Sequence, residues 1–310
     1  MNAIITAATG YTEADLQIFL WSVARNCQDT VVFLIVYRRD RESIEKLQSK
    51  YPFVRPIYIG ASIRKQFSRL ANYRTRPYYS WLAHQLSKKD YSSIIPALRP
   101  LGQFSTRIIH ERFFIALKII KTYCNSFSNV LLTDCRDVVI QRDPFSLING
   151  KLVSGCEPVS IENEQYTLNW IKEVYGDEVF DRVSNNPVVC AGVTLGPVKQ
   201  VETYLTEICN EMWRHLPQMS FKSWGYDQSA HIYLIFEKQI SLSLTNNQQG
   251  LIATVSLECP SNIFIDLQSR LVKVHNNYPA IIHQYDRHPN LLSFFEETSE
   301  FHDRTLQKTN

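Results

Sequence analysis

The 310-residue sequence has little of what characterises several specialised classes of protein. Glycine and proline occur only 10 and 13 times and are scattered, which excludes a collagen-like, linker-dominated or disordered chain. The seven cysteines include no CxxC pair and lie mostly inside apolar runs, so we expect reduced core residues. The longest continuous apolar run, residues 31–37, is far shorter than the roughly 20 residues of a membrane span. We therefore expect a globular, cytoplasmic protein. Peripheral association with a membrane stays open.

An excess of charge of one sign is also missing. The formal net charge of +3 falls short of the concentrated positive field of a dedicated nucleic-acid binder, so we expect no nucleic-acid partner. Basic residues do gather between positions 64 and 99, among several tyrosines and Trp81. Two interpretations stay open for this stretch: a solvated helical face beside a loop, or a flap over an anionic substrate or a membrane surface.

What the sequence does contain is enough apolar material, 45% of its residues, for a large core, and we expect a single domain over residues 1–310. The first part alternates strand and helix patterns: strands at 2–8, 30–37 and 55–59, a helix opened by a capping box of Thr12 and Asp15, and a helix at 41–50. Such alternation predicts parallel strands with right-handed crossovers. The predicted fold class is α/β, with a mixed, mainly parallel central sheet flanked by helices.

The remaining sequence is less regular. Residues 60–102 have no clean period and are predicted to be an insertion, followed by a long helix from Ser105 and a buried strand at 129–133. Shorter strands are predicted at 151–156, 188–195, 240–244, 251–255 and 263–265. Helices are predicted at 165–175 and 200–215, with a short one in the tail at 291–295.

The segment VLLTDCRDVVIQRDPF places two carboxylates, Asp134 and Asp137, where the strand at 129–133 ends. Ligands of open α/β sheets bind at such places. Hard divalent cations such as Mn²⁺ or Mg²⁺ take oxygen ligands and share them with substrate phosphates, which paired acids suit. A structural interpretation is also open, in which Asp134 caps the turn and Asp137 pairs with Arg136 or Arg142. Asp143 is more typical of the start of a turn.

This segment and the helix before it resemble the core of GT-A glycosyltransferases, especially the glycogenin and galactosyltransferase-like branch. The resemblance implies a GT-A, Rossmann-like fold, in which Arg112 helps to hold a nucleotide and the acids bind a metal and the donor diphosphate. The spacing DCRD departs from the D-x-D of the family. The resemblance also divides the chain into a nucleotide-binding half, residues 1–145, and an acceptor-binding half with a C-terminal tail, residues 146–310.

Two further segments follow in the order of the family. Ala191 and Gly192, in the run CAGV, resemble an N/S-A-G-V element whose small residues let the backbone approach the donor sugar, although a lone glycine in a strand is equally typical of packing. Asp227 and Gln228 resemble a D-Q element near the donor sugar or the reaction centre, and are the predicted catalytic residues. Glu157 is a second acid that would face the acceptor.

The last match lies near the C-terminus. His283, at the end of an apolar strand, resembles the late histidine that completes the metal site with Asp134 and Asp137, although the Gly and Lys that usually follow it are missing, and His275 is a rival. At the end of the first strand, Thr6, Ala7 and Tyr11 would receive the base and ribose.

The resemblance therefore implies a metal-dependent hexosyltransferase. It would move a sugar from a nucleoside-diphosphate sugar, with UDP the expected nucleotide, to a hydroxyl of a glycan, lipid or small molecule. Bound Mn²⁺ or Mg²⁺ would stabilise the departing diphosphate. Asp227 would be a general base in an inverting reaction or stabilise the reaction centre in a retaining one, and the branch favours retention.

Three alternatives remain. One is a non-catalytic scaffold of the same fold that binds a nucleotide or a glycan. A sugar nucleotidyltransferase is disfavoured because the first turn, TAATGYTEAD, has a single glycine and no Lys or Arg for a triphosphate. A phosphatase with a D-x-D nucleophile is disfavoured because Arg136 stands where its second acid would be.

Overall fold

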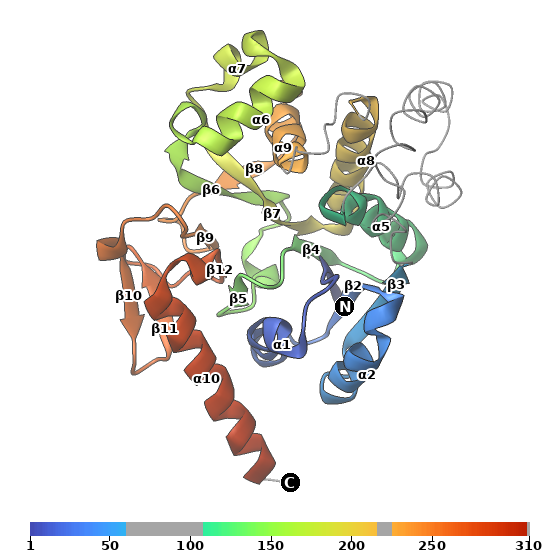
Figure 1. The fold of residues 1–310 in the computed structure, drawn as a ribbon, viewed down its shortest axis with the longest axis vertical. Coiled ribbons are helices and arrows are strands. Elements are labelled where there is room, and N and C mark those ends of the chain that lie inside the picture. Colours follow the sequence, from blue (N-terminus) through green and yellow to red (C-terminus); the bar gives the residue numbers. More distant parts are fainter. Residues whose placement is uncertain (60–107, 216–224, 309–310) are drawn as a thin grey trace.

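A central sheet of seven strands organises the computed structural model, which describes residues 1–59, 108–215 and 225–308 (Figure 1). The strand order is β3 (Val54–Ile59), β2 (Thr30–Tyr37), β1 (Asn2–Ala7), β4 (Asn129–Thr133), β7 (Pro187–Pro197), β6 (Val153–Ser160) and β8 (Ser243–Thr245). Strands β3, β2, β1 and β4 pair in parallel, as do β6 and β8, whereas β7 is antiparallel to both its neighbours. The predicted mixed, mainly parallel sheet is confirmed.

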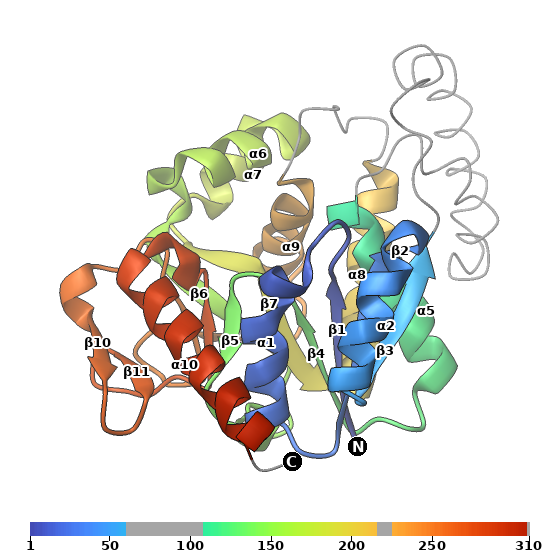
Figure 2. The same ribbon diagram turned by 60° about the horizontal axis from the view of Figure 1, so that its bottom comes forward.

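Helices cover both faces of this sheet (Figures 1 and 2). On one face lie α5 (Ile108–Tyr123), α8 (Val198–Arg214) and α9 (Tyr226–Phe236), and on the other α1 (Glu13–Asn26) and α2 (Arg41–Lys50). Successive side chains of a strand point to opposite faces, so Ala3 and Ile5 of β1 pack with α5 and α8, while Ile4 packs with α1 and α2. Burial on both faces explains the nearly continuous apolar sequence of β1, β2 and β4.

The turn after β1 is closed by the predicted capping box. The amide of Asp15 donates to Oγ1 of Thr12 at 3.4 Å, and the amide of Thr12 donates to Oδ2 of Asp15 at 2.8 Å. This exchange satisfies amides that a helix start leaves without intrahelical partners. It thereby fixes the start of α1 directly after the loop that carries Tyr11.

A smaller, three-stranded sheet lies beside the first and joins the middle of the chain to its end. It consists of β5 (Val138–Ile140), β12 (Ile281–His283) and β9 (Ile252–Thr254). The hairpin of β10 (Ile263–Asp266) and β11 (Leu271–Val274) follows β9 along the chain, and α10 (Pro289–Lys308) packs on α1 (Figure 1). Helices α6 (Gln165–Tyr175) and α7 (Asp177–Val183) follow β6, and α6 packs on α9.

Some expectations need correction. The tail helix runs over Pro289–Lys308 instead of the predicted 291–295. All seven cysteines are free; five are buried as expected, but Cys259 is exposed and Cys124 is partly so. The predicted insertion at 60–102 and its basic and aromatic residues lie outside the described residues. Among the helices that are described, none has the length and apolar character needed to cross a membrane.

Candidate metal centre

The acidic segment connects the two sheets. Asp134 and Asp137 stand at the two ends of the short connection between β4 and β5. The amide of Asp134 donates to the carbonyl of Gly192 in β7 at 2.8 Å, and the amide of Gln284, directly after β12, donates to the carbonyl of Asp137 at 2.7 Å. Each end of the connection is therefore fixed by a different strand. The three-residue spacing of Asp134 and Asp137 therefore corresponds to the passage of the chain from the seven-stranded sheet to the three-stranded sheet.

Strand pairing brings His283 to the two acids. Strand β12 is antiparallel to β5, with His283 opposite Val138, the residue after Asp137. Nε2 of His283 lies 3.8 Å from Oδ2 of Asp134 and 4.0 Å from Oδ2 of Asp137. One potential ligand atom from each of the three residues lies within 4.8 Å of the others. The triad of Asp134, Asp137 and His283 could therefore hold a metal ion.

The chemistry of the triad fits a divalent cation. His283 is fully buried, and within the described part of the chain neither of its ring nitrogens has a hydrogen-bond partner. A buried polar group without a partner is costly, and a cation would supply one. Two ionised carboxylates would also carry two negative charges for a cation to balance, and a bound cation would require the neutral form of the imidazole. Carboxylates favour Mg²⁺ or Mn²⁺ and imidazole also suits other transition metals, so the ligands fit a divalent ion without fixing its identity.

Gly192 makes room for the triad. A Cβ atom on this residue would lie 2.5 Å from Cε1 of His283 and 2.7 Å from Oδ2 of Asp134. The sequence predicts that small residues here admit the donor sugar. In the structure the space above Gly192 is used by two of the potential metal ligands.

Arg112 of α5 links the triad to the acid that is predicted to be catalytic. Its guanidinium donates to Oδ1 of Asp134 and, at 3.1 Å, to Oδ2 of Asp227. Burial opposes ionisation of Asp134, but Arg112 and His283 outweigh it and hold the pKa of this carboxyl below its usual range. Burial raises the pKa of Asp227 to about 6, although Arg112 opposes this. Asp134 is thus ionised and suited to a cation, whereas Asp227 exchanges protons nearer neutrality.

Gln228 makes different contacts from its neighbour. Its Oε1 accepts from the amide of Ala191 at 2.9 Å, and its Nε2 donates to the carbonyl of Val189 at 2.7 Å. Both ends of the side-chain amide therefore hold the strand that carries Ala191 and Gly192. These contacts position β7, and the catalytic role of Gln228 stays a prediction.

A cavity of about 700 Å³ adjoins the triad. Most of the predicted site residues line it: Tyr11, Arg112, Asp134, Asp137, Glu157, Ala191, Gly192, Asp227 and Gln228. The volume is typical of small-molecule and cofactor sites. Burial and the nearby Cys135 and Asp134 raise the pKa of Tyr11 to about 12, so its phenol stays neutral and can donate a hydrogen bond. Burial likewise raises the pKa of Glu157, to about 7.

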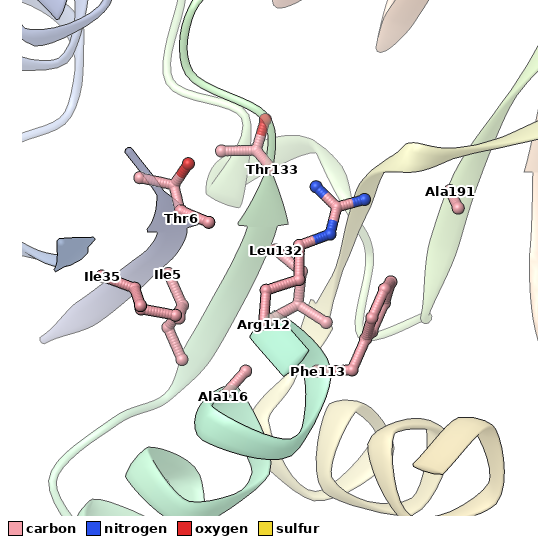
Figure 3. A pocket seen from close by; sticks show the side chains of 10 residues that line it. Ile5, Thr6, Ile35, Arg112, Phe113, Ala116, Leu132, Thr133 and Ala191 are labelled. Atoms are coloured by element: carbon pink, nitrogen blue, oxygen red, sulfur yellow. The ribbon is translucent and has the colours of Figure 1, made fainter. Parts of the chain in front are cut away.

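Two predicted donor residues, Thr6 and Ala7, are not among the residues that line this cavity. They border a pocket of about 20 Å³ that also touches Arg112 and Ala191 (Figure 3). Such a space holds about one water molecule. Figure 3 shows the guanidinium of Arg112 ending between Thr133 and Ala191. The contact of Thr6 and Ala7 with a donor nucleotide stays a prediction.

His275 and Asp143, the two alternative candidates for the metal site, contact other residues. Nε2 of His275 lies 3.3 Å from Oε2 of Glu258, and His275 is not part of the triad. Asp143 accepts from the amide of Phe145 at 3.0 Å, as expected at the start of a turn.

The arginines near Asp137 are engaged elsewhere. Arg136 pairs with Asp286 at 3.5 Å, and Arg142 donates to the backbone carbonyls of Gly250 and Tyr278. The structural interpretation of Asp137 as the partner of either arginine is therefore not supported.

Several residues that line the cavity escaped the sequence analysis. They include Tyr166 and Trp170 of α6, Leu257 after β9, and Arg287 after β12. The sequence position of Arg287 could have indicated its role, since a cationic side chain four residues after a potential metal ligand is suited to an anionic substrate. Tyr166 and Trp170 had none, because one turn of an amphipathic helix looks the same whether it faces a cavity or the core.

Comparison with models of known protein families gives no match for this sequence, and comparison with curated proteins gives none either.

Proposed function

We propose that the protein is a metal-dependent glycosyltransferase of the GT-A type, which transfers a sugar from a nucleoside-diphosphate sugar, with UDP the expected nucleotide, to a hydroxyl acceptor. One observation carries the proposal: the triad of Asp134, Asp137 and the buried His283 at the carboxyl end of β4, beside a cavity that also contains Arg112 and Asp227. Ligand sites of α/β sheets lie at such strand ends. The three residues that the motifs predicted as metal ligands lie together in the structure, which supports the proposal.

The residues of the site would have different roles in the reaction. A divalent cation on the triad would supply a positive charge that stabilises the diphosphate leaving group. Arg112 orients Asp134 and neutralises part of its charge, which keeps the carboxylate fixed in the absence of the donor. Tyr11, on the turn after β1, offers a ring and a neutral hydroxyl to the nucleotide.

Asp227 is the residue that we assign to the reaction centre. It is only 7% exposed, lines the cavity and is held by Arg112. We propose retention of configuration, on the strength of the resemblance, with Asp227 stabilising positive charge at the anomeric carbon. Gln228 would act through β7, by holding the backbone at Ala191 against the cavity.

Donor turnover tests this proposal. The protein is incubated with a panel of UDP- and GDP-sugars and Mn²⁺, and nucleotide release is followed with and without EDTA. We expect slow hydrolysis of one donor that EDTA abolishes and that Asp227→Asn lowers by about a hundredfold. The matched control is Asp181→Asn, on the exposed face of α7, which should leave the rate unchanged. Binding of UDP without turnover of any donor would favour the non-catalytic scaffold.

A further inference from the structure

One wall of the cavity differs from the rest because it is aromatic and apolar. Tyr166 and Trp170 of α6 line it, with ring centroids 5.9 Å apart and planes inclined by 34°. Tyr166 is 69% exposed, and Leu257, which also lines the cavity, is 48% exposed. Large exposed aromatic and apolar side chains that face a cavity are a usual feature of binding sites.

This wall lies next to the proposed reaction centre. A Cβ atom on Gly225 would lie 2.0 Å from Cδ2 and Cε3 of Trp170, so the indole rests directly on the backbone of this glycine. Gly225 is the N-cap of α9, and Asp227 is in the first turn of that helix. A ligand stacked on Trp170 would therefore lie beside the helix end that carries Asp227.

Two acids of the cavity lining lie near the start of α6. Glu157 of β6 lines the cavity here, together with Glu164, whose two carboxylate oxygens accept from the amides of Tyr166 and Thr167 at 3.1 and 2.7 Å. The side chain of Glu164 is thus committed to capping α6, whereas Glu157 lines the cavity without a capping role. Carboxylates repel phosphates and accept hydrogen bonds from hydroxyl groups. The wall suits a neutral ligand that is rich in hydroxyls.

Resting on the proposed function, we infer that the acceptor is itself a neutral carbohydrate, whose terminal pyranose ring stacks on Trp170 and Tyr166 and donates a hydroxyl hydrogen bond to Glu157. A pyranose has one face of C–H groups and a rim of hydroxyls. An aromatic ring buries that apolar face, and a carboxylate beside it receives the rim. A phosphorylated acceptor or the head group of an anionic lipid would meet repulsion from Glu164, and from Glu157 whenever that carboxyl is ionised.

Saturation-transfer NMR with Mg²⁺ and UDP present tests the inference, using maltose, cellobiose and lactose as neutral probes and glucose 6-phosphate as the anionic one. We expect transfer to ring protons of at least one disaccharide and less to the phosphate. Trp170→Ala should reduce the signal by about fivefold through loss of the stacked ring. Trp170→Phe should restore most of it. Phe264→Ala, which removes a 52% exposed aromatic of β10 that does not line the cavity, should leave it unchanged.

Two results would overturn the inference: an equal signal in Trp170→Ala, or no transfer to any disaccharide by wild-type protein that binds UDP. Titration of UDP into the same samples separates this failure from that of the proposed function. If Trp170→Ala loses the disaccharide but binds UDP like the wild type, the aromatic wall is an acceptor site. If wild-type protein binds no nucleotide, the proposed function fails, and the disaccharide signal then reports only whether the wall binds a carbohydrate.

Discussion

At the residue scale, the site depends on how closely two side chains approach the backbone of Gly192 in β7. Asp134 and His283 both stand over Gly192, and the carbonyl of the same residue accepts from the amide of Asp134. Arg112 donates to the other carboxylate oxygen of Asp134, Oδ1, and fixes it. A metal site with this geometry has little freedom to adjust, because packed interiors resist even the volume of a methyl group.

Gly192→Ala is therefore predicted to disrupt the triad. The new methyl would overlap His283 and Asp134, and we expect Mn²⁺ affinity to fall by about tenfold or more, as when the surroundings of metal ligands are altered. Isothermal titration of Mn²⁺ measures this. Gly155→Ala is the matched control, since its methyl would meet mainly the side chain of Ile252, at 2.7 Å. We expect Gly155→Ala to lower stability but keep Mn²⁺ affinity, and equal affinities in both variants would contradict the assignment.

Sequence reasoning could assemble the triad but could not specify its contacts. Asp134, Asp137 and His283 were predicted together because their order along the chain matches a known arrangement. The contacts of Gln228 with β7 could not be predicted, since an amide in a D-Q motif reveals nothing about which backbone groups it meets. The same holds for Trp170, whose role depends on Gly225, a residue 55 positions away in the chain.

At the element scale, strongly patterned segments were predicted well. Strand β2 and helix α2 have the predicted bounds. An uninterrupted β-branched run favours a strand, and a polar segment with a narrow apolar stripe favours a helix. Strand β5 was missed because three residues show no period. Helix α9 was missed because it is buried on almost every side and has little amphipathic pattern.

The end of α8 offers an element-scale prediction on pH. The hydrogen bond to Glu211 raises the pKa of His215 above its usual 6.5, and His215 in turn helps to lower the pKa of Glu211 below 4.5, against the effect of burial. A raised histidine pKa stabilises the fold below the unfolded-state value, and this contribution is lost as the pH rises through the folded-state value. The lowered pKa of Glu211 stabilises the fold above about 4.5, and this contribution is lost as the pH falls through the folded-state value.

We therefore expect the contribution of this pair to the free energy of unfolding to be largest between about pH 4.5 and 6.5. Urea unfolding across pH 4 to 9 and NMR titration of His215 measure it. Glu211→Gln should bring the pKa of His215 back toward 6.5. If the histidine titrates at the same pH in both proteins, the pairing is wrong.

At the scale of the whole molecule, the C-terminal helix is connected to the metal centre through a chain of contacts. Phe295 of α10 packs edge-on against Tyr285, with ring centroids 5.1 Å apart. The hydroxyl of Tyr285 donates to the carbonyl of Arg136 at 3.2 Å, inside the connection that carries Asp134 and Asp137. The end of the chain thus helps to hold the acidic segment, although some 150 residues separate them.

Phe295→Ala is predicted to weaken both stability and metal binding. Removing a ring that is only 2% exposed should cost about 3 to 5 kcal/mol of unfolding free energy, and Mn²⁺ affinity should fall because Tyr285 loses its support. Denaturant unfolding and Mn²⁺ titration of the folded protein measure the two effects. Phe264→Ala, at an exposed position on β10, should change neither. Loss of stability with unchanged Mn²⁺ affinity would show that α10 supports the fold but not the site.

Metal-dependent nucleotide binding is tested by isothermal titration of UDP into the protein with Mn²⁺ and with EDTA, for the wild type and for Asp137→Ala. We predict binding in the micromolar range that requires the metal and disappears in the variant, because the triad would hold the cation to which the diphosphate binds. Absence of UDP and GDP binding under every condition would contradict a metal-dependent transferase and leave the triad without its proposed substrate.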